Sequence, residues 1–236
     1  MTQSERYYDE FSHTYEDQRH RGYHKMLDEL EVEVARRYMQ GRVLEAGCGT
    51  GLVLERLRPH VDEVVGIDLS SGMLNHARGR QLRVAQATVE GLPFPDESFD
   101  GVTSFKVLAH VPGIQEAMAE MARVTRPGGH LVLEFYNRRS LRHLVKMLKS
   151  PSRIGKGYVD TDVFTRYDSL ADIDAYLPDS LERIAIHGVR IITPVAQLHD
   201  LPFVGPLLAR VERRLCESKW ASHFGGFLIV VLRKRA

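Results

Sequence analysis

The sequence predicts an α/β fold built on a mostly parallel β-sheet. Apolar runs typical of strands alternate with amphipathic stretches typical of helices between residues 42 and 136, and a glycine-rich bend follows the first run. This alternation is the pattern of βαβ units, in which each helix carries the chain back so that the next strand runs parallel. The length of 236 residues, with 43% hydrophobic residues and no internal repeat, fits one domain with a substantial core.

The predicted elements follow one another in a regular order. Residues 24–39 place Leu27, Leu30, Val34 and Tyr38 at spacings of three and four, which predicts an amphipathic helix. Short apolar runs predict strands over 42–46, 63–68, 81–87, 98–105 and 130–136. Helices are expected over 52–58, after a cap at Ser70 or Ser71, and over 114–125, the last stopping before the breakers at 127–129.

The pattern changes after Tyr136. Residues 138–162 are first basic and then polar, and a long strand is predicted at 181–193. A variable segment over 194–220 leads to a last strand at 223–234. Two late strands joined by a helical insertion indicate an antiparallel pair at one edge of the sheet.

The charge balance and the cysteines argue against several function classes. Lys plus Arg is 32 and Asp plus Glu is 31, whereas a dedicated nucleic-acid binder usually carries a basic excess. The basic segment 138–149 is therefore interpreted as a solvated helix face. Cys48 and Cys216 have no metal-ligand spacing, so no metal is expected. The chain begins without an apolar signal core, and its longest apolar run, 227–232, is too short to span a bilayer, so we expect a cytoplasmic protein.

The glycine-rich bend is the most informative segment. The first predicted strand ends at Ala46, and Gly47, Gly49 and Gly51 follow at alternate positions. Glycine allows a tight turn and lets a ligand lie against the backbone, and the next helix presents free N–H groups. Asp68 ends the second predicted strand, where a carboxylate can accept two hydrogen bonds from a ribose diol. The pattern predicts a nucleoside-containing ligand at the carboxyl ends of the strands.

The spacing of the glycines separates two ligand classes. Dinucleotide folds carry GxGxxG, but Leu52 stands where the third glycine would be. That glycine allows close packing of the helix on the strand, which a ligand without a pyrophosphate does not require. The loop therefore disfavours a nicotinamide oxidoreductase.

Four segments occur in a recognisable order and spacing. They are VLEAGCGTG from Val43, VVGIDLSSGML from Val64, EGLPFPDESFDGVTSFKVLAHV from Glu90 and RVTRPGG from Arg123. Together they resemble the class I S-adenosylmethionine-dependent methyltransferases, particularly the UbiE-like group. The resemblance implies a Rossmann-like seven-stranded, mostly parallel sheet with helices on both faces and an antiparallel last strand. It also implies S-adenosyl-L-methionine as the cofactor.

The resemblance divides the single domain into three parts and assigns cofactor contacts. Residues 1–40 would form a helical lid, 41–136 the cofactor-binding core and 137–236 the substrate-side half, with a cap insertion at about 194–220. Thr88 stands where the family often has Asp. The implied contacts are Glu45, Ala46, Gly47, Gly49 and Gly51 for the amino-acid part, Asp68 for the ribose, Leu69, Met73, Thr88 and Val89 for the adenine, and Phe105 for the methionine portion. Core packing is the alternative for Leu69 and Met73.

Three residues are candidates for the chemistry. Methyl transfer from a sulfonium mainly needs positioning, and a base serves only an acceptor that has a proton to lose. His110 follows the fourth strand at the ligand-facing end, and its ordinary pKa suits proton removal at neutral pH; a structural role is the alternative. Tyr136 ends the fifth strand and could orient an acceptor or simply pack. His199, beside Asp200, is a second candidate base or part of a solvated loop.

The N-terminal segment carries aromatic residues. Tyr7, Phe11 and Tyr15 recur every four residues, so they would share one helical face. In the resembling family this segment folds over the cofactor, and Tyr15 would face the sulfonium or shield the methionine arm. An ordinary apolar docking stripe is the alternative.

The 194–220 insertion indicates the kind of acceptor. Leu198, Leu201, Phe203 and Leu207 favour an apolar or aromatic acceptor if the insertion covers the carboxyl ends of the strands; a small cap core or a dimer contact are alternatives. We therefore expect methyl transfer to O, N or C of a small metabolite by a monomer or homodimer, with no nucleic-acid partner and no membrane span. The alternative functions are an RNA or protein methyltransferase and a non-catalytic binding protein of this fold.

Overall fold

The computed structural model describes residues 3–17, 19, 22–148, 153–154, 158–159, 164–193 and 195–236. Most of the polar stretch predicted at 151–162 lies outside the described residues, as does residue 194, where the predicted cap insertion begins. Among the described residues, no helix is both long and apolar enough to cross a membrane.

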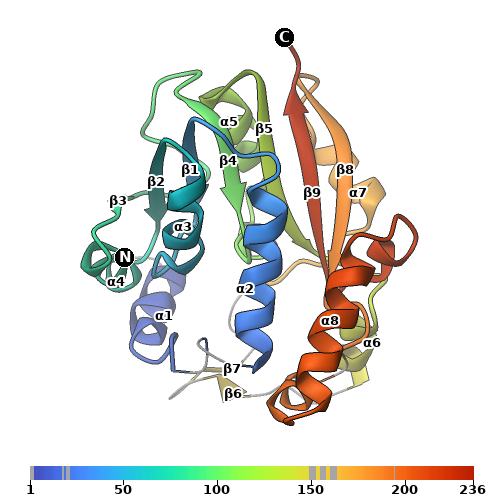
Figure 1. Ribbon diagram of the computed structural model, residues 1–236. Helices are drawn as coiled ribbons and strands as arrows, with labels where there is room; N and C mark the ends of the chain where they lie inside the picture. Colours follow the sequence, from blue (N-terminus) through green and yellow to red (C-terminus); the bar gives the residue numbers. More distant parts are fainter. Residues whose placement is uncertain are drawn as a thin grey trace.

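The centre of the molecule is a seven-stranded sheet in the order β3-β2-β1-β4-β5-β9-β8 (Figure 1). Neighbouring strands from β3 to β5 are parallel, and β9 is antiparallel to both β5 and β8. The mostly parallel sheet with an antiparallel last strand is therefore confirmed. The strands are β1 Arg42–Ala46, β2 Glu63–Asp68, β3 Arg83–Gln86, β4 Phe99–Ser104, β5 Thr125–Tyr136, β8 Leu181–Val189 and β9 Phe227–Lys234, and the two short strands β6 Arg153–Ile154 and β7 Tyr158–Val159 pair separately.

Helices cover both faces of the sheet, as predicted. In Figure 1, α2 and α8 lie in front of the strands, and α5 and α7 lie behind them. The α-helices are α1 Gln3–Ser12, α2 Gly22–Ala35, α3 Leu52–Leu57, α4 Ser71–Gly79, α5 Ile114–Val124, α6 Leu141–Leu148, α7 Leu170–Tyr176 and α8 Val204–Cys216. The short 3₁₀ turns are η1 Arg58–His60, η2 Leu108–His110, η3 Ala196–Asp200 and η4 Ala221–Phe224.

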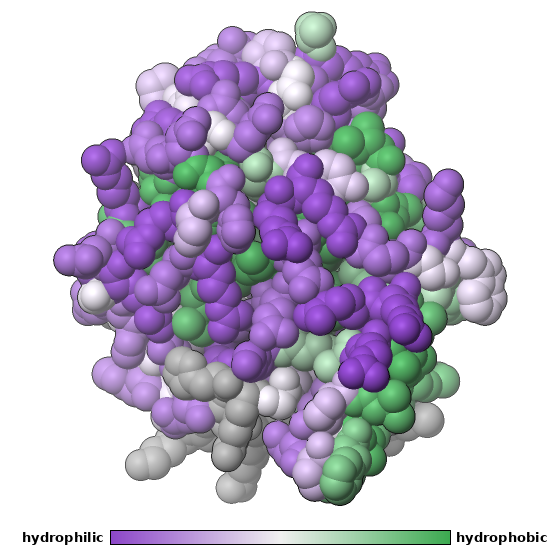
Figure 2. All heavy atoms as spheres, in the orientation of Figure 1, coloured by the Kyte–Doolittle hydropathy of each residue, from purple (hydrophilic) through white to green (hydrophobic). Residues whose placement is uncertain are grey.

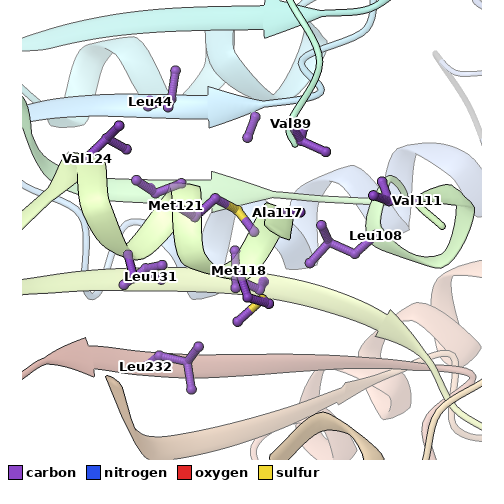
Figure 3. Packing of buried hydrophobic residues seen from close by; sticks show 14 of the residues in the cluster. Leu44, Val89, Leu108, Val111, Ala117, Met118, Met121, Val124, Leu131 and Leu232 are labelled. Carbon is purple, nitrogen blue, oxygen red and sulfur yellow. The ribbon is translucent and has the colours of Figure 1, made fainter. Parts of the chain in front are cut away.

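The core forms on both faces because successive side chains of a strand point to opposite sides. Val43 of β1 and Val132 of β5 belong to the cluster that contains α2, whereas Leu44 belongs to the cluster that contains α5. Figure 3 shows Met118 and Met121 of α5 packed over the strands of the second cluster. Each such side chain, when fully buried, contributes about 1.5–3 kcal/mol to folding.

The predicted break at 127–129 is partly wrong, because β5 begins at Thr125 and runs through these residues. Phe99 of β4 pairs with Thr125 and Gly101 pairs with His130, so the register shifts between the two pairs. The additional residues on β5 form an irregularity that the strand accommodates at its solvent-exposed end. The proline and glycines end α5 as expected but do not delay the strand.

Other boundaries also differ from the prediction. The helix predicted at 24–39 ends at Ala35, and the strand predicted at 181–193 ends at Val189. The next backbone N–H groups, from Ile191 to Thr193, donate to the Glu212 carboxylate instead of a neighbouring strand. α1 ends at Ser12, so its aromatic stripe does not continue as helix beyond that residue.

The carboxyl ends of β1 to β5 and of β8 lie at one edge of the sheet. The parallel pairing of the first five strands places their ends together, and β8 shares their direction because both β5 and β8 are antiparallel to β9. In Figure 1 this edge faces downward, with α1, α6 and the first turns of α8 below it. Ligands of open α/β sheets bind at this edge.

Candidate active site

The glycine-rich loop leaves β1 and is fixed to the neighbouring strand. Ala46 is fully buried, and the N–H groups of Gly47 and Cys48 both donate to the Ile67 carbonyl at 2.8 Å. Gly47 has a φ of 83°, and a Cβ there would collide with the Val107 side chain. Both the turn and the tight fit to the segment after β4 therefore require glycine.

The middle of the loop leaves room for a ligand. Gly49 has a φ of 53°, and no heavy atom lies within 4 Å of the position that its Cβ would take. Gly51 is the N-cap of α3, whose first N–H groups point toward the loop end of the helix. The backbone is thus open at Gly49 and partly positive, as a carboxylate-bearing or nucleoside ligand requires.

Asp68 is joined directly to this loop. Its Oδ2 accepts the Gly49 N–H at 2.8 Å, and its Oδ1 accepts the Ser70 N–H at 2.9 Å. Burial raises the pKa of Asp68, whereas these backbone hydrogen bonds lower it, and the net direction is upward. Each carboxylate oxygen has a second lone pair, so Asp68 retains two acceptor sites, the number that a ribose diol needs.

The predicted adenine neighbours lie beyond the ends of β2 and β3. Ser70 caps α4 by accepting the Met73 N–H, and the Met73 side chain is buried. Leu69 is half-buried, and Val89 packs in the core. Thr88 is exposed, and its hydroxyl already donates to Glu90 Oε2 at 3.2 Å. An adenine contact by Thr88 would have to replace that bond.

A buried ion cluster, absent from the sequence-based expectations, joins α2 to the segment after β4. Lys106 Nζ lies 2.5 Å from Glu31 Oε1 and 3.2 Å from Asp28 Oδ1, and both carboxylate side chains are fully buried. Burial lowers the pKa of Lys106, but Glu31 and Asp28 raise it more, so the lysine stays charged. Phe105, the predicted methionine neighbour, precedes this lysine and is buried in the same α2 cluster.

Two more buried carboxylates, Glu45 of β1 and Glu134 of β5, are 3% and 1% exposed. Within the described part of the chain, Glu45 Oε2 and both oxygens of Glu134 accept no hydrogen bond. Burial raises the pKa of both groups well above 4.5, and the charge of Glu31 adds to the effect. A buried carboxylate without a partner is costly, so a cationic ligand group would be favoured here. The contact of Glu45 with the amino-acid part of the cofactor stays a prediction.

His110 and Tyr136 are brought together at the ends of β4 and β5. The Phe164 carbonyl lies 2.8 Å from His110 Nδ1, and a carbonyl can only accept, so Nδ1 carries the proton. His110 Nε2 is 3.4 Å from the Tyr136 hydroxyl. Burial lowers the pKa of His110 and raises the pKa of Tyr136 to about 12. The pair therefore presents a neutral imidazole and a protonated phenol at neutral pH.

His199 lies in a different environment. It is buried rather than part of a solvated loop, which corrects that alternative. Thr193 Oγ1 donates to Glu212 Oε1 at 2.7 Å, so it accepts from His199 Nε2 at 3.0 Å. These bonds anchor η3 to α8 and to the end of β8, which gives His199 a structural task.

The N-terminal segment approaches the site through residues that the sequence did not single out. Asp9 accepts hydrogen bonds from Ser70 Oγ at 2.5 Å and from the Gly72 N–H at 2.9 Å, which docks α1 on α4. Burial raises the pKa of Tyr8, and the nearby Tyr136 and Asp68 raise it further. Tyr8 therefore lies near both Tyr136 and Asp68.

Tyr15 lies in the turns after α1. Its ring contacts Phe11 at 5.4 Å, and the Arg19 guanidinium lies over it at 4.1 Å. Burial raises the pKa of Tyr15, and Lys106 is among the charges acting on it. Tyr15 therefore lies close to the ion cluster.

One group of side chains in the described part of the chain could hold a metal ion. The ligand atoms of His187, Cys216 and Glu217 lie within 4.8 Å of one another. The Arg37 guanidinium already pairs with Glu217 Oε2 at 2.6 Å. Burial raises the pKa of Cys216 to about 12, which opposes formation of the thiolate that a metal would need. We assign no metal to this group.

Comparisons with known proteins match the part of the chain that forms this site. A family model described as a methyltransferase domain matches residues 44–133, the segment from β1 to β5 that carries the glycine loop and Asp68. The ubiquinone biosynthesis O-methyltransferase of Alkalilimnicola ehrlichii is 37% identical over 139 residues, which cover 55% of this chain and 56% of that protein. The ubiquinone/menaquinone biosynthesis C-methyltransferase UbiE of Geobacter sulfurreducens is 33% identical over 153 residues, 60% of this chain and 57% of that protein.

The chain thus spans little more than half the length of these curated relatives. A solved structure covers more of it. The crystal structure of an S-adenosylmethionine-dependent methyltransferase from Thermotoga maritima, a possible histamine N-methyltransferase, covers 98% of this chain and 99% of its own with a TM-score of 0.73. At 21% sequence identity this likeness concerns the fold.

Proposed function

We propose that this chain, which belongs to the class I S-adenosylmethionine-dependent methyltransferases of the UbiE-like type, transfers a methyl group to a small metabolite. The donor is S-adenosyl-L-methionine, and the acceptor atom is an oxygen, nitrogen or carbon of an apolar or aromatic molecule. The observation that carries the proposal is the 2.8 Å hydrogen bond from the Gly49 N–H to Asp68 Oδ2, which joins the open glycine loop to a carboxylate with acceptor sites to spare.

The chain's own residues would hold the cofactor at two ends. Asp68 would accept the ribose hydroxyls, and the backbone around Gly49 leaves space for the nucleoside. Glu45 would accept from the amino group of the methionine part, which gives its unpartnered Oε2 a cationic neighbour. The bound cofactor supplies an already activated methyl group, so alignment of the acceptor can account for about 7–11 kcal/mol of the barrier.

His110 and Tyr136 are the residues we assign to the acceptor. The Tyr136 phenol stays protonated, and its proton donates to His110 Nε2, because Nδ1 carries the imidazole proton and donates to the Phe164 carbonyl. The Tyr136 oxygen can then accept a hydrogen bond from an ionisable acceptor, which orients it, and the acceptor's proton passes to His110 Nε2 through the Tyr136 hydroxyl.

Aromatic side chains around Tyr136 support an apolar or aromatic acceptor. The rings of Tyr167 and Phe227 lie 5.7 and 5.1 Å from the Tyr136 ring, and the Arg142 guanidinium lies 4.4 Å above it. Flat aromatic surfaces favour stacking with an aromatic acceptor. Two similar proteins carry names from ubiquinone biosynthesis, which agrees with such an acceptor.

The proposal is tested by cofactor binding and transfer. Asp68→Ala should weaken S-adenosylhomocysteine binding by about 1.5–3 kcal/mol for each charge-assisted hydrogen bond lost, measured by isothermal titration calorimetry. Asp62→Ala is the matched control, because Asp62 is exposed just before β2, at the opposite end of the strand from Asp68. Labelled methyl transfer should then be detected with a panel of phenols, catechols and amines. Binding of NADH without binding of S-adenosylhomocysteine would refute the proposal.

A further inference from the structure

Two arginines from different elements meet beside the residues that we assign to the acceptor. The guanidinium of Arg142, on α6, lies 4.4 Å from the centre of the Tyr136 ring and 4.7 Å from that of the Phe227 ring. Arg190 follows the end of β8. A Cβ at Gly226 would lie 3.1 Å from Cδ of Arg142 and 3.3 Å from Cδ of Arg190, so both side chains pack against the same glycine.

A buried tyrosine of α2 lies next to this pair. The Arg190 guanidinium lies 5.1 Å from the centre of the Tyr23 ring. Burial raises the pKa of Tyr23, and the charges of Arg190 and Arg142 oppose the rise, so both guanidinium groups act on one phenol. Tyr23 is 7% exposed, and no residue in the described part of the chain gives its hydroxyl a well-formed hydrogen bond. Because an unsatisfied buried hydroxyl is costly, an oxygen atom of a ligand would be a favourable partner.

Arg142 is not neutralised by a carboxylate. Among the residues that the structure describes, its one hydrogen bond runs from Nη1 to the Tyr167 hydroxyl at 3.3 Å, and it forms no ion pair. Its charge lowers the pKa of Glu134, but burial and Glu31 raise that pKa more, so the charge of this neighbouring carboxyl is disfavoured. The half-buried guanidinium therefore keeps most of its donors for a ligand.

The backbone of Arg190 is strained. Its φ of 60° lies in the left-handed region, which residues other than glycine and asparagine rarely adopt. Contacts on both sides hold this conformation, because the Gly226 N–H donates to the Arg190 carbonyl at 2.9 Å and Arg190 Nε donates to the Thr193 carbonyl at 3.2 Å. Strain of this kind often occurs at binding sites, where the surrounding structure fixes one side chain in place.

The surface next to Tyr23 is largely apolar. The His199 ring lies 5.8 Å from the Tyr23 ring, and Gly205 of α8 packs on the His199 backbone. Asp200 is exposed, and residues 201–209 contain no charged side chain. Figure 2 shows the resulting hydrophobic area at the lower right, over the first turns of α8. Apolar surroundings strengthen the attraction between a guanidinium and an anion.

We propose that Arg142, Arg190 and Tyr23 bind an anionic oxygen group, a carboxylate or a phosphate, carried by the methyl acceptor. The inference deepens the proposed function and rests on it. The Tyr136 hydroxyl lies 3.4 Å from His110 Nε2, and the ring of the same tyrosine contacts Arg142. An aromatic acceptor whose reacting hydroxyl meets the Tyr136 oxygen would extend its anionic substituent to the arginines. Guanidinium groups bind such oxygens through two parallel hydrogen bonds.

The position of the arginines in the sheet favours the acceptor over the carboxylate of the cofactor. The glycine loop and Asp68 lie at the ends of β1 and β2, whereas Arg142 and Arg190 follow β5 and β8, in the other half of the strand order. The carboxylate of the cofactor is therefore the competing occupant, and the experiment must distinguish the two.

The test is titration calorimetry of the full chain, with and without S-adenosylhomocysteine. The ligands are 3,4-dihydroxybenzoate, the neutral 3,4-dihydroxybenzamide and the cationic 3,4-dihydroxybenzylamine, which differ mainly in charge. We expect the benzoate to bind at least about tenfold more tightly than the benzamide, and the benzylamine to bind most weakly. Benzoate and phenyl phosphate then compete with the dihydroxybenzoate, and the tighter competitor identifies the anion as carboxylate or phosphate.

Substitutions separate recognition of the charge from a structural role. Arg142→Gln should lower the affinity for 3,4-dihydroxybenzoate at least about tenfold and leave that for the benzamide unchanged, and Arg190→Gln should act in the same direction. Arg142→Lys should keep part of the preference, because it retains the charge without the planar fork. Arg139→Gln, at an exposed position just before α6, is the matched control. Equal loss of both ligands in Arg142→Gln would overturn the proposal.

Binding of S-adenosylhomocysteine separates the remaining outcomes. Its affinity should be the same in Arg142→Gln and in the unaltered chain. If it falls together with that of the dihydroxybenzoate, the arginines bind the carboxylate of the cofactor and the proposal fails. If the unaltered chain binds S-adenosylhomocysteine but does not prefer the benzoate to the benzamide, this proposal fails and the proposed function stands. If S-adenosylhomocysteine does not bind at all, the proposed function fails and this proposal fails with it.

Discussion

At the scale of single residues, the pair formed by His110 and Tyr136 depends on one backbone carbonyl. The Phe164 oxygen holds the proton on His110 Nδ1 and so leaves the lone pair on Nε2, toward the phenol. Burial lowers the pKa of the imidazole, which keeps it neutral where most acceptors react. This arrangement supports the proposed role of His110 as a base.

His110→Asn should lower kcat about 10²- to 10⁴-fold with an acceptor that must lose a proton, and leave S-adenosylhomocysteine affinity unchanged. Because the pKa of His110 lies below 6.5, turnover of the unaltered chain should stay level above that pH and fall as the pH drops through the lowered pKa. A pH profile of kcat measures both effects. His76→Asn, at an exposed position of α4, is the control. An unaltered kcat in the His110 variant would leave this residue with a structural role only.

The contribution of Glu134 to the free energy of unfolding should fall as the pH rises, whereas the turnover that depends on His110 should rise. Its folded-state pKa is raised above the unfolded value, so its charge destabilises the fold at high pH, and the penalty disappears as the pH falls through the raised pKa. Glu134→Gln should therefore raise the free energy of unfolding by about 1–3 kcal/mol at pH 8 and by much less at pH 5. Urea denaturation at the two pH values measures the difference. Glu116→Gln, on the exposed side of α5, should show no such pH-dependent gain, and a gain of equal size at both pH values would contradict the account.

The residues of the glycine loop and Asp68 could be predicted from the sequence because they act within one strand-turn-helix unit and the next strand. The ion cluster could not, since Asp28, Glu31 and Lys106 come from two segments that only the fold brings together. One signal was available for the buried charges: Glu134 is the one charged residue in the buried, otherwise hydrophobic stretch 131–136 of β5. A carboxylate in such a position needs a partner or a function.

At the scale of elements, α1 is held by a carboxylate rather than by its aromatic stripe alone. Asp9 accepts hydrogen bonds at the first turn of α4, the helix that begins three residues after Asp68. The rings of Tyr7 and Phe11 stack at 5.8 Å, and neighbouring Tyr8 lies near Asp68. This attachment supports the proposed role of α1 as a lid over the cofactor.

Asp9→Ala should detach this lid. The loss of two hydrogen bonds to a carboxylate should weaken S-adenosylhomocysteine binding about tenfold, mainly through faster dissociation, because α1 no longer covers the site. Stopped-flow dissociation and hydrogen exchange of the amides in residues 3–12 measure the two consequences. Glu10→Gln, the next residue on the same helix and exposed, should leave both unchanged. Equal dissociation rates in the two variants would remove α1 from the site.

Elements with strong local signals agree best with the sequence. β1 and β2 have the predicted bounds, because each is an apolar run that ends at glycine or at a carboxylate. α7 was missed although Ser169 and Asp172 form a capping box, since seven residues are too few to show a helical period. β8 ends early because the next N–H groups donate to the carboxylate of Glu212, about twenty residues along the chain. These hydrogen bonds depend on tertiary structure and leave no local pattern in the sequence.

At the scale of the whole molecule, the site is assembled from strand ends that are distant in the sequence. Glu45 and Asp68 lie at the carboxyl ends of β1 and β2, Lys106 follows β4, and Lys106 pairs with Glu31 of α2. A ligand that bridges these segments binds only the native chain and therefore stabilises the entire domain. The order of βαβ units predicted this assembly, whereas the docking of α1 had to come from the structure.

This linkage gives a prediction for the intact protein. S-adenosylhomocysteine at one hundred times its Kd should add about 2.7 kcal/mol to the free energy of unfolding. For a domain of this length, such a gain raises Tm by roughly 5–10 °C, which a thermal melt detects. NADH at the same concentration should give no shift, because Leu52 stands where the dinucleotide loop needs a third glycine. Asp68→Ala should lose most of the shift while Asp62→Ala keeps it, and an equal shift with NADH would mean that the crevice recognises only the adenosine that the two ligands share.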